Sequence, residues 1–373
     1  MKYLVNLFRI IVGVIFILSG LAKTIDPIGF SFKLEEYFSP EIFNLPFLAE
    51  NALMLSTFFV LLEILLGILL LLGKHKNFTL VSLLGLIVFF TFLTFYSAYF
   101  NKVTDCGCFG DALKLEPWQS FQKDLVLLIM ILVLYFGRTH IRPLFSNSIS
   151  TVLSTVLMSI SIFIAYLGIY KMPIKDFRAY APGKDLIKGM KSAEELGLTP
   201  PQYQVIYTMK QKGDNTEVEI TDKQYMDELW WEKPRWEMVE SKTRNVKISS
   251  GYEPPVKDFD INCGEEDKTQ EILSKPLVFI ITSYNPEKAD PKGLERAKQL
   301  AQLLKQENLE TYGTSPTGYD FQTQNCQMDG TTLKTINRSN PGLMILKKGV
   351  VYRKTNWQNF PKDKQELNTL LTN

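Results

Sequence analysis

The distribution of apolar residues divides the chain near residue 170. Five long apolar runs occupy about residues 4–22, 51–72, 78–100, 121–137 and 149–170. Each run is close to the roughly 20 helical residues that cross the ~30 Å hydrocarbon core of a bilayer, although the fourth would need tilt or a start nearer Trp118. We therefore predict five transmembrane helices. The first is expected to be an uncleaved span, because SGLAKTIDP lacks a small-x-small cleavage site.

The density of charge changes at the same point. Residues 1–170 hold 11 of the 41 Lys and Arg and 10 of the 39 Asp and Glu, so most charge lies in residues 171–373. The second half is therefore expected to be water-soluble. A net charge of +2 without a basic run argues against nucleic-acid binding, and four cysteines exclude a disulfide-dense scaffold. No Ser/His/Asp or phosphate-binding motif is present, which sets hydrolase and NTPase functions aside.

Short basic loops predict the orientation in the membrane. The loops Lys74–Lys76 and Arg138–Arg142 carry basic residues and no acidic ones, and Lys2 and Arg9 flank the start of the first run. Such loops are typical of the cytoplasmic side. We expect a bacterial inner-membrane protein with a cytoplasmic N-terminus, with residues 171–373 on the periplasmic side.

A cysteine loop, residues 105–111, lies between the third and fourth runs and reads Asp-Cys-Gly-Cys-Phe-Gly-Asp. Cys106 and Cys108 can close a small ring whose disulfide torsion is strained, and strained, exposed disulfides tend to be oxidising. The pair is either redox-active, with Asp105 beside it, or a fixed structural disulfide. We predict no metal site, because both histidines fall in cytoplasmic loops and thiolates would need Asp105 or Asp111 to complete a shell.

Several motifs together resemble the DoxX/MauE-type four-helix membrane domain over about residues 1–140. They are Arg9–Lys23 with Asp26-Pro27, Leu62–Gly67, Leu72-Gly73, and the loop Cys106–Gly110, which matches MauE-like members. The resemblance implies a role in thiosulfate–quinone oxidoreduction or in disulfide formation in periplasmic partners, with a quinone as the implied cofactor. Five spans followed by a soluble half resemble the Bacteroidota subgroup of DoxX-like proteins.

Glu63 is a carboxylate near the middle of the second span, where it is costly unless paired or neutral. Arg9 lies in the first span at a depth that differs by roughly 5 Å at the helical rise per residue. We predict a buried Arg9–Glu63 pair. A proton path that serves a quinone is the alternative.

The soluble half divides into a small β-rich segment and a second domain. Alternating residues at Tyr203–Met209 and Thr216–Ile220 predict a hairpin. From Val256 a βαβ-then-αββα order, with Pro341 directly before the penultimate strand, resembles a thioredoxin fold and its cis-proline. Ser283–Pro286 follow the first strand without the C-x-x-C of that family, so the resemblance implies the fold but no disulfide exchange at this position.

The predicted architecture is a membrane α-helical bundle followed by a soluble α/β thioredoxin-like domain. The predicted domains are 1–145 (four spans), 146–172 (fifth span), 173–255 (β-rich segment) and 256–373 (thioredoxin-like domain). Cys263 and Cys326 could pair, stay reduced, or exchange electrons with the cysteine loop.

Two functions stay open at this point. The first is a membrane-anchored thiol–disulfide redox protein that acts through Cys106 and Cys108 on a periplasmic client, with lipid around it and a quinone as candidate electron acceptor. The second is a non-catalytic accessory subunit of a cell-envelope complex.

Overall fold

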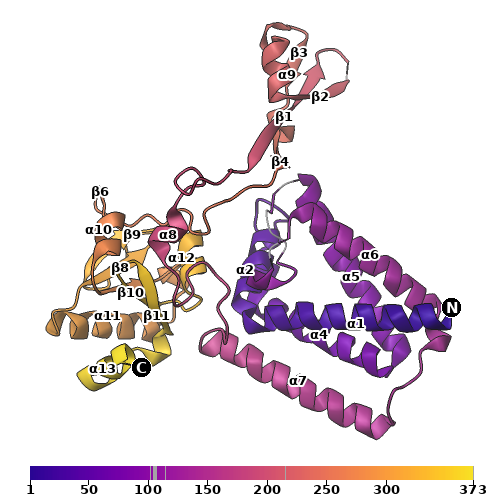
Figure 1. The fold of residues 1–373 in the computed structure, drawn as a ribbon, viewed down its shortest axis with the longest axis horizontal. Coiled ribbons are helices and arrows are strands. Elements are labelled where there is room, and N and C mark those ends of the chain that lie inside the picture. The colour runs from indigo at the N-terminus through magenta and orange to yellow at the C-terminus, as the bar shows by residue number, and fades with distance from the viewer. Residues whose placement is uncertain (101, 104–106, 114, 215, 373) are drawn as a thin grey trace. The chain divides into compact units, whose positions relative to one another are not determined.

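The computed structural model describes residues 1–100, 102–103, 107–113, 115–214 and 216–372. The described residues form two compact units, Met1–Lys184 together with Asp258–Asn373, and Asp185–Lys257. Figure 1 labels most of the helices and strands of both units.

Long apolar helices make up the N-terminal part of the first unit. Among the described residues, five are long and apolar enough to cross a membrane: α1 (Lys2–Ile25), α4 (Ala52–Leu72), α5 (Lys76–Phe100), α6 (Pro117–Phe136) and α7 (Asn147–Tyr170). Each corresponds to one predicted span, so the predicted membrane bundle is confirmed. A capping box of Glu116 and Gln119 starts α6 early enough for the short fourth run to reach spanning length.

The segment between α1 and α4, which has no predicted helix, is largely helical. It contains α2 (Pro27–Phe38) and the short α3 (Pro46–Glu50). The Asp26 side chain caps α2 by accepting a hydrogen bond from the Gly29 N–H. Phe30, Leu34 and Tyr37 are buried in one cluster with residues of α4 and α5. α2 is therefore part of the bundle, at the end where α1 finishes.

Glycines set the register between α1 and α4. A Cβ on Gly13 would lie 2.6 Å from the Leu71 side chain, and one on Gly67 would lie 2.9 Å from the Gly13 carbonyl oxygen. A Cβ on Gly20 would lie 2.5 Å from the Ile64 side chain. The two antiparallel helices thus approach closely, and the last turns of α1 face the middle of α4.

The C-terminal part of the first unit is built on a mixed sheet. Over the described residues its seven strands have the order β11-β10-β7-β8-β9-β5-β6. Their bounds are β5 (Asn262–Cys263), β6 (Glu266–Asp267), β7 (Val278–Thr282), β8 (Thr311–Ser315), β9 (Gln324–Gln327), β10 (Gly342–Lys347) and β11 (Val350–Asn356). β7, β8 and β9 run parallel, whereas β10 is antiparallel to both β7 and β11.

Helices alternate with these strands in the predicted order. They are α10 (Thr269–Ser274), α11 (Pro291–Gln306), α12 (Gly330–Ile336) and α13 (Lys364–Thr372). Ala297, Leu300 and Leu304 of α11 share a core with Phe279 of β7 and Leu367 of α13. The β7–α11–β8, then α12–β10–β11–α13 order confirms the predicted thioredoxin-like fold. The short 3-10 turns of this unit are η1 (Gly110–Ala112), η2 (Arg138–His140), η5 (Pro286–Lys288) and η6 (Trp357–Asn359).

The second unit is a small sheet centred on β1 (Gln202–Gln211). β1 pairs antiparallel with β2 (Glu217–Thr221), β3 (Trp236–Met238) and β4 (Arg244–Ser249), so the predicted hairpin is present. Met209, Ile220 and Trp230 form its core. The remaining elements are α8 (Leu186–Met190), α9 (Asp222–Asp227), η3 (Trp230–Glu232) and η4 (Glu240–Lys242). Gly183 and Lys184 instead hydrogen-bond to Val351 of β11, so the end of the 171–184 segment belongs with the first unit.

Candidate functional site

A buried ion pair joins the last turn of α1 to the middle of α4. Lys23 Nζ lies 2.5 Å from Glu63 Oε1, and Ser19 Oγ lies 3.2 Å from Glu63 Oε2. Lys23 and Glu63 are each only 2% exposed. Ser19 and Lys23 are four residues apart and therefore project from the same face of α1. A charged pair in this position is costly to bury, which makes it a candidate functional site.

The predicted Arg9–Glu63 pair is wrong. The Arg9 guanidinium donates to the carbonyl oxygens of Leu70 (2.8 Å), Leu71 (2.5 Å) and Arg142 (2.8 Å). Leu70 and Leu71 belong to the last turn of α4, where carbonyls lack the N–H four residues ahead in the helix, although the Gly73 N–H also donates to Leu70. The glycine contacts place Arg9 beside this end of α4, about two turns away from Glu63. The Arg9 N–H groups therefore donate to backbone carbonyl oxygens and not to the Glu63 carboxylate.

The cysteine loop is described from Gly107 onward. Cys106 and Asp105 lie outside the described residues. Cys108 is half-buried, and its carbonyl oxygen accepts a hydrogen bond of 2.8 Å from Ser19 Oγ. Gly107 adopts a φ of +65°, which favours glycine and turns the chain between the cysteines. Ser19 thus links the loop to the Glu63 carboxylate.

A small cavity lined by both charged and apolar side chains lies under this loop. Its volume of about 30 Å³ is enough for about one water molecule. Lys123 Nζ lies 2.5 Å from Asp124 Oδ1, and Thr94 Oγ1 donates to Asp124 Oδ2 at 3.0 Å. The lining residues are Ser19, Lys23, Phe30, Leu34, Tyr37, Glu63, Phe90, Leu93, Thr94, Cys108, Lys123 and Asp124.

Sequence analysis identified Glu63 and Cys108 in this site but not their charged neighbours. Lys23, Lys123 and Asp124 carried a usable signal, because each is an ionisable residue inside or at the edge of an apolar run. Over the described residues, no group of three or more His, Cys, Asp or Glu side chains is arranged to hold a metal ion.

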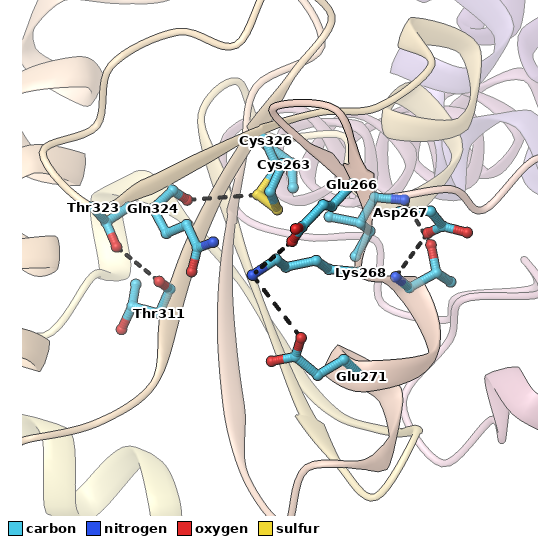
Figure 2. Close-up of a disulfide and its surroundings, with 12 residues drawn as sticks. Cys263, Glu266, Asp267, Lys268, Glu271, Thr311, Thr323, Gln324 and Cys326 are labelled. Atoms are coloured by element: carbon cyan, nitrogen blue, oxygen red, sulfur yellow. Dashed lines mark hydrogen bonds and ion pairs between the residues drawn. A yellow bond between two sulfur atoms is a disulfide. The ribbon is translucent and has the colours of Figure 1, made fainter.

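The second pair of cysteines forms a disulfide. Cys263 on β5 and Cys326 on β9 are bonded across strands that pair in the sheet, with their Cα atoms 4.1 Å apart. Of the three alternatives left open by the sequence, the structure contains the structural pairing. Figure 2 shows the disulfide with Lys268 near Glu266 and Glu271, at distances of 3.6 and 4.0 Å.

The segment that directly follows β7 in the thioredoxin-like domain, Ser283–Pro286, has no cysteine. Ser283 Oγ lies 2.6 Å from Asn340 Oδ1, and Asn340 Nδ2 donates to the Asn285 carbonyl at 2.7 Å. The Asn340–Pro341 peptide bond is cis, at the position given by the resemblance to the fold. Polar side chains therefore tie together the segments that flank β7 and β10, and the Ser283–Pro286 segment cannot itself exchange disulfides.

Comparison with known proteins supports the membrane part of this picture. Residues 1–137 match the family model described as "Methylamine utilisation protein MauE", which confirms the MauE-like resemblance of the membrane domain. The chain is also 27% identical over 198 residues to "Protein TlpB" of Flavobacterium psychrophilum, covering 51% of this chain and 52% of that protein. The chain thus spans about half the length of this relative. No solved structure gives a significant match.

Proposed function

We propose that this protein is a membrane-anchored thiol–disulfide redox protein whose exchanging pair is Cys106 and Cys108. One observation carries the proposal: the Ser19 hydroxyl lies within hydrogen-bond distance of both the Cys108 carbonyl, at 2.8 Å, and the carboxylate of the buried Lys23–Glu63 pair, at 3.2 Å. A disulfide that only tightens a loop needs no ionisable groups beneath it. A reacting thiol, in contrast, must lose and regain a proton, since the thiolate is the nucleophile.

The reaction has two halves that balance. A client thiolate attacks the Cys106–Cys108 disulfide and forms a mixed disulfide, and the second client thiolate then releases the reduced pair. The client is oxidised to a disulfide, and the protein gains two electrons and two protons. In this scheme the cysteine thiols lose their protons when the disulfide is formed again, and the nearby Lys23–Glu63 pair accepts and passes on these protons.

The electron acceptor that we propose is a membrane quinone. A groove of about 310 Å³ on α1 and α6 is lined by Ile15, Gln119, Gln122, Lys123, Val126, Leu127 and Met130. The apolar side chains fit the ring and isoprenoid tail of a quinone, and Gln119, Gln122 and Lys123 can donate hydrogen bonds to the ring's carbonyl oxygens. Lys123 also lines the cavity under the cysteine loop, so the two sites share a residue. A bound quinone would accept the two electrons and two protons.

The proposed location is the bacterial inner membrane, with the cysteine loop and residues 171–373 on the periplasmic side. The basic loops at Lys74–Lys76 and Arg138–Arg142 support this orientation. The periplasm favours oxidised cysteines, and the Cys263–Cys326 disulfide agrees with that environment. An amine label that cannot cross membranes should therefore reach residues 171–373 in intact spheroplasts. Labelling only after lysis contradicts the orientation.

Thiol trapping after an acid quench tests the function. In growing cells the pair should be found in both oxidised and reduced forms, and Cys108→Ser should leave Cys106 in a mixed disulfide with its client. Cys106→Ser/Cys108→Ser is the matched control that traps nothing. A pair that is always oxidised, traps no partner and can be replaced by serines without a phenotype would instead favour an accessory subunit of an envelope complex. The absence of a C-x-x-C motif from the thioredoxin-like domain is the observation that supports this alternative function.

A further inference from the structure

A buried arginine of the thioredoxin-like domain binds acidic side chains from the membrane domain. Arg338 lies between α12 and the cis-proline Pro341, and only 7% of it is exposed. Its Nε donates to Asp26 Oδ2 at 2.7 Å, and its Nη2 donates to Asp111 Oδ2 at 2.6 Å. Its Nη1 donates to the Lys334 carbonyl oxygen at 2.7 Å.

The acidic partners come from separate elements. Asp26 caps α2, and Asp111 belongs to η1 and is the last residue of the cysteine loop, three positions after Cys108. Burial alone would raise the pKa of Asp26, but the charges of Arg338 and Arg178 outweigh it and keep that pKa below its usual range. For Arg338, burial alone would lower the pKa, and Asp26 and Asp111 reverse that effect. Asp26 and Arg338 are therefore both charged.

The neighbouring contacts show that this edge of the thioredoxin-like domain packs on α2. The Phe32 ring of α2 meets the Tyr284 ring edge-on at 5.3 Å and lies 5.4 Å from the Arg338 guanidinium. Tyr284 is the second residue after β7, in the segment Ser283–Pro286 that lacks the C-x-x-C of the thioredoxin family. A half-exposed ion pair between Lys334 and Glu35, at 3.3 Å, joins the same surfaces without touching the cysteine loop.

We propose that Arg338 is a positioning residue of the cysteine loop: by binding Asp111 and Asp26 together, the thioredoxin-like domain fixes the loop on the membrane domain and sets its reactivity. This inference rests on the proposed function. A guanidinium suits the role because its planar fork can hold both carboxylates at once. Movement of the loop would leave the buried Arg338 guanidinium without one of its carboxylate partners. A domain that lacks the C-x-x-C motif thus contributes to the cysteine pair of another domain.

The test uses the full-length protein in nanodiscs, with Asp111→Asn, Arg338→Gln and Arg338→Lys. Both Asp111→Asn and Arg338→Gln should speed hydrogen exchange in the loop peptide, and each should change the glutathione exchange equilibrium of the cysteines at least about fivefold. The pH profiles of thiol alkylation should move in opposite directions. Loss of the Arg338 charge shifts the profile to higher pH, whereas loss of the Asp111 charge shifts it to lower pH. Arg338→Lys should restore the profile but not the protection of the loop.

Glu35→Gln is the control, because it weakens the same docking surface away from the loop and should behave as the wild type. Asp111→Asn and Arg338→Gln variants that match Glu35→Gln in all measurements would overturn the proposal. If Arg338→Gln does not fold, Asp111→Asn decides, since it leaves the Arg338–Asp26 pair in place. If the cysteines exchange with glutathione in no variant, the proposed function fails, and loop hydrogen exchange still tests the role of Arg338.

Discussion

The two cysteine sites of this chain lie in different surroundings. Cys263 and Cys326 join neighbouring strands of the thioredoxin-like sheet, and Cys326 is 1% exposed. The charges nearby, Lys268 with Glu266 and Glu271, form ion pairs that reach solvent (Figure 2). Cys108, in contrast, lines a cavity with the buried side chains of Lys23, Glu63 and Asp124.

This difference is the one expected between a structural cross-link and a reactive pair of the kind proposed for the cysteine loop. A cross-link stabilises the fold by restricting the unfolded chain, and needs only strands at the right distance. Exchange chemistry needs a thiolate and a route for its proton. Buried ionisable groups cost stability, so their presence beside one cysteine site and not the other is what favours the cysteine loop as the chemical site.

The largest effect is expected from breaking the ion pair under the loop. Lys23→Met should leave the buried Glu63 without its directly bonded cation and cost about 3–5 kcal/mol of stability. Lys23→Met/Glu63→Gln should recover part of that loss, because no charge remains uncompensated. Thermal unfolding in detergent measures both. A double variant that is as unstable as the sum of the single variants would mean that the pair does not form.

Arg9 provides the matched comparison within the same helix. It bonds to carbonyl oxygens near the other end of α1, far from Glu63. The losses caused by Arg9→Met and Glu63→Gln should therefore add to within about 0.5 kcal/mol. A larger coupling energy between the two substitutions would indicate that Arg9 and Glu63 do interact, contrary to the structure.

The second effect separates the two cysteine sites directly. The Cys263–Cys326 disulfide closes a chain segment with a sequence separation of 63. Cys263→Ser/Cys326→Ser should therefore cost about 2–4 kcal/mol, measured by urea unfolding with tryptophan fluorescence. Cys106→Ser/Cys108→Ser should cost much less, since these cysteines are two residues apart. Thiol cycling of the cysteine loop should survive loss of the other disulfide; equal stability losses, or loss of cycling, would contradict the assignment.

Much of the fold could be predicted from periodicity. Apolar runs identified the membrane helices, and a buried strand before a helical segment identified β7 and α11. Helix α2 was missed because it lies between spans and is too polar to resemble one. Its buried Phe30, Leu34 and Tyr37 have the i, i+4, i+7 spacing of one helical face, so the signal was present.

The site was less predictable, because its partners depend on helix register. Glu63 was identified by its depth, but depth alone could not choose between Arg9 and Lys23. Close contacts at Gly13 and Gly20 decide that choice, and a single sequence does not reveal which glycines meet. Arg338 is 312 residues from Asp26 and gave no local signal at all.

The smallest predicted effect is a loss of stability at low pH, and it comes from an aspartate beside the thioredoxin-like domain. Asp176, between α7 and the thioredoxin-like sheet, binds Arg178 Nε at 2.7 Å and also pairs with Lys354 of β11. Burial alone would raise the pKa of Asp176, but Arg178 and Lys354 outweigh it and lower the pKa from 3.8 to about 2.

Because the folded-state pKa is depressed, the stabilisation from Asp176 is fully present above about pH 4 and is lost as the pH falls toward 2. The difference between the folded and unfolded pKa values corresponds to about 2 kcal/mol. Urea unfolding of the wild type and Asp176→Asn between pH 5 and pH 3 measures the roughly 1 kcal/mol of it that is lost by pH 3, and the variant should have the shallower pH dependence. Removing the Cys263–Cys326 disulfide should lower stability without changing that slope, because a disulfide does not titrate. Equal slopes for the wild type and Asp176→Asn would show that Asp176 does not link acid to the stability of the soluble part.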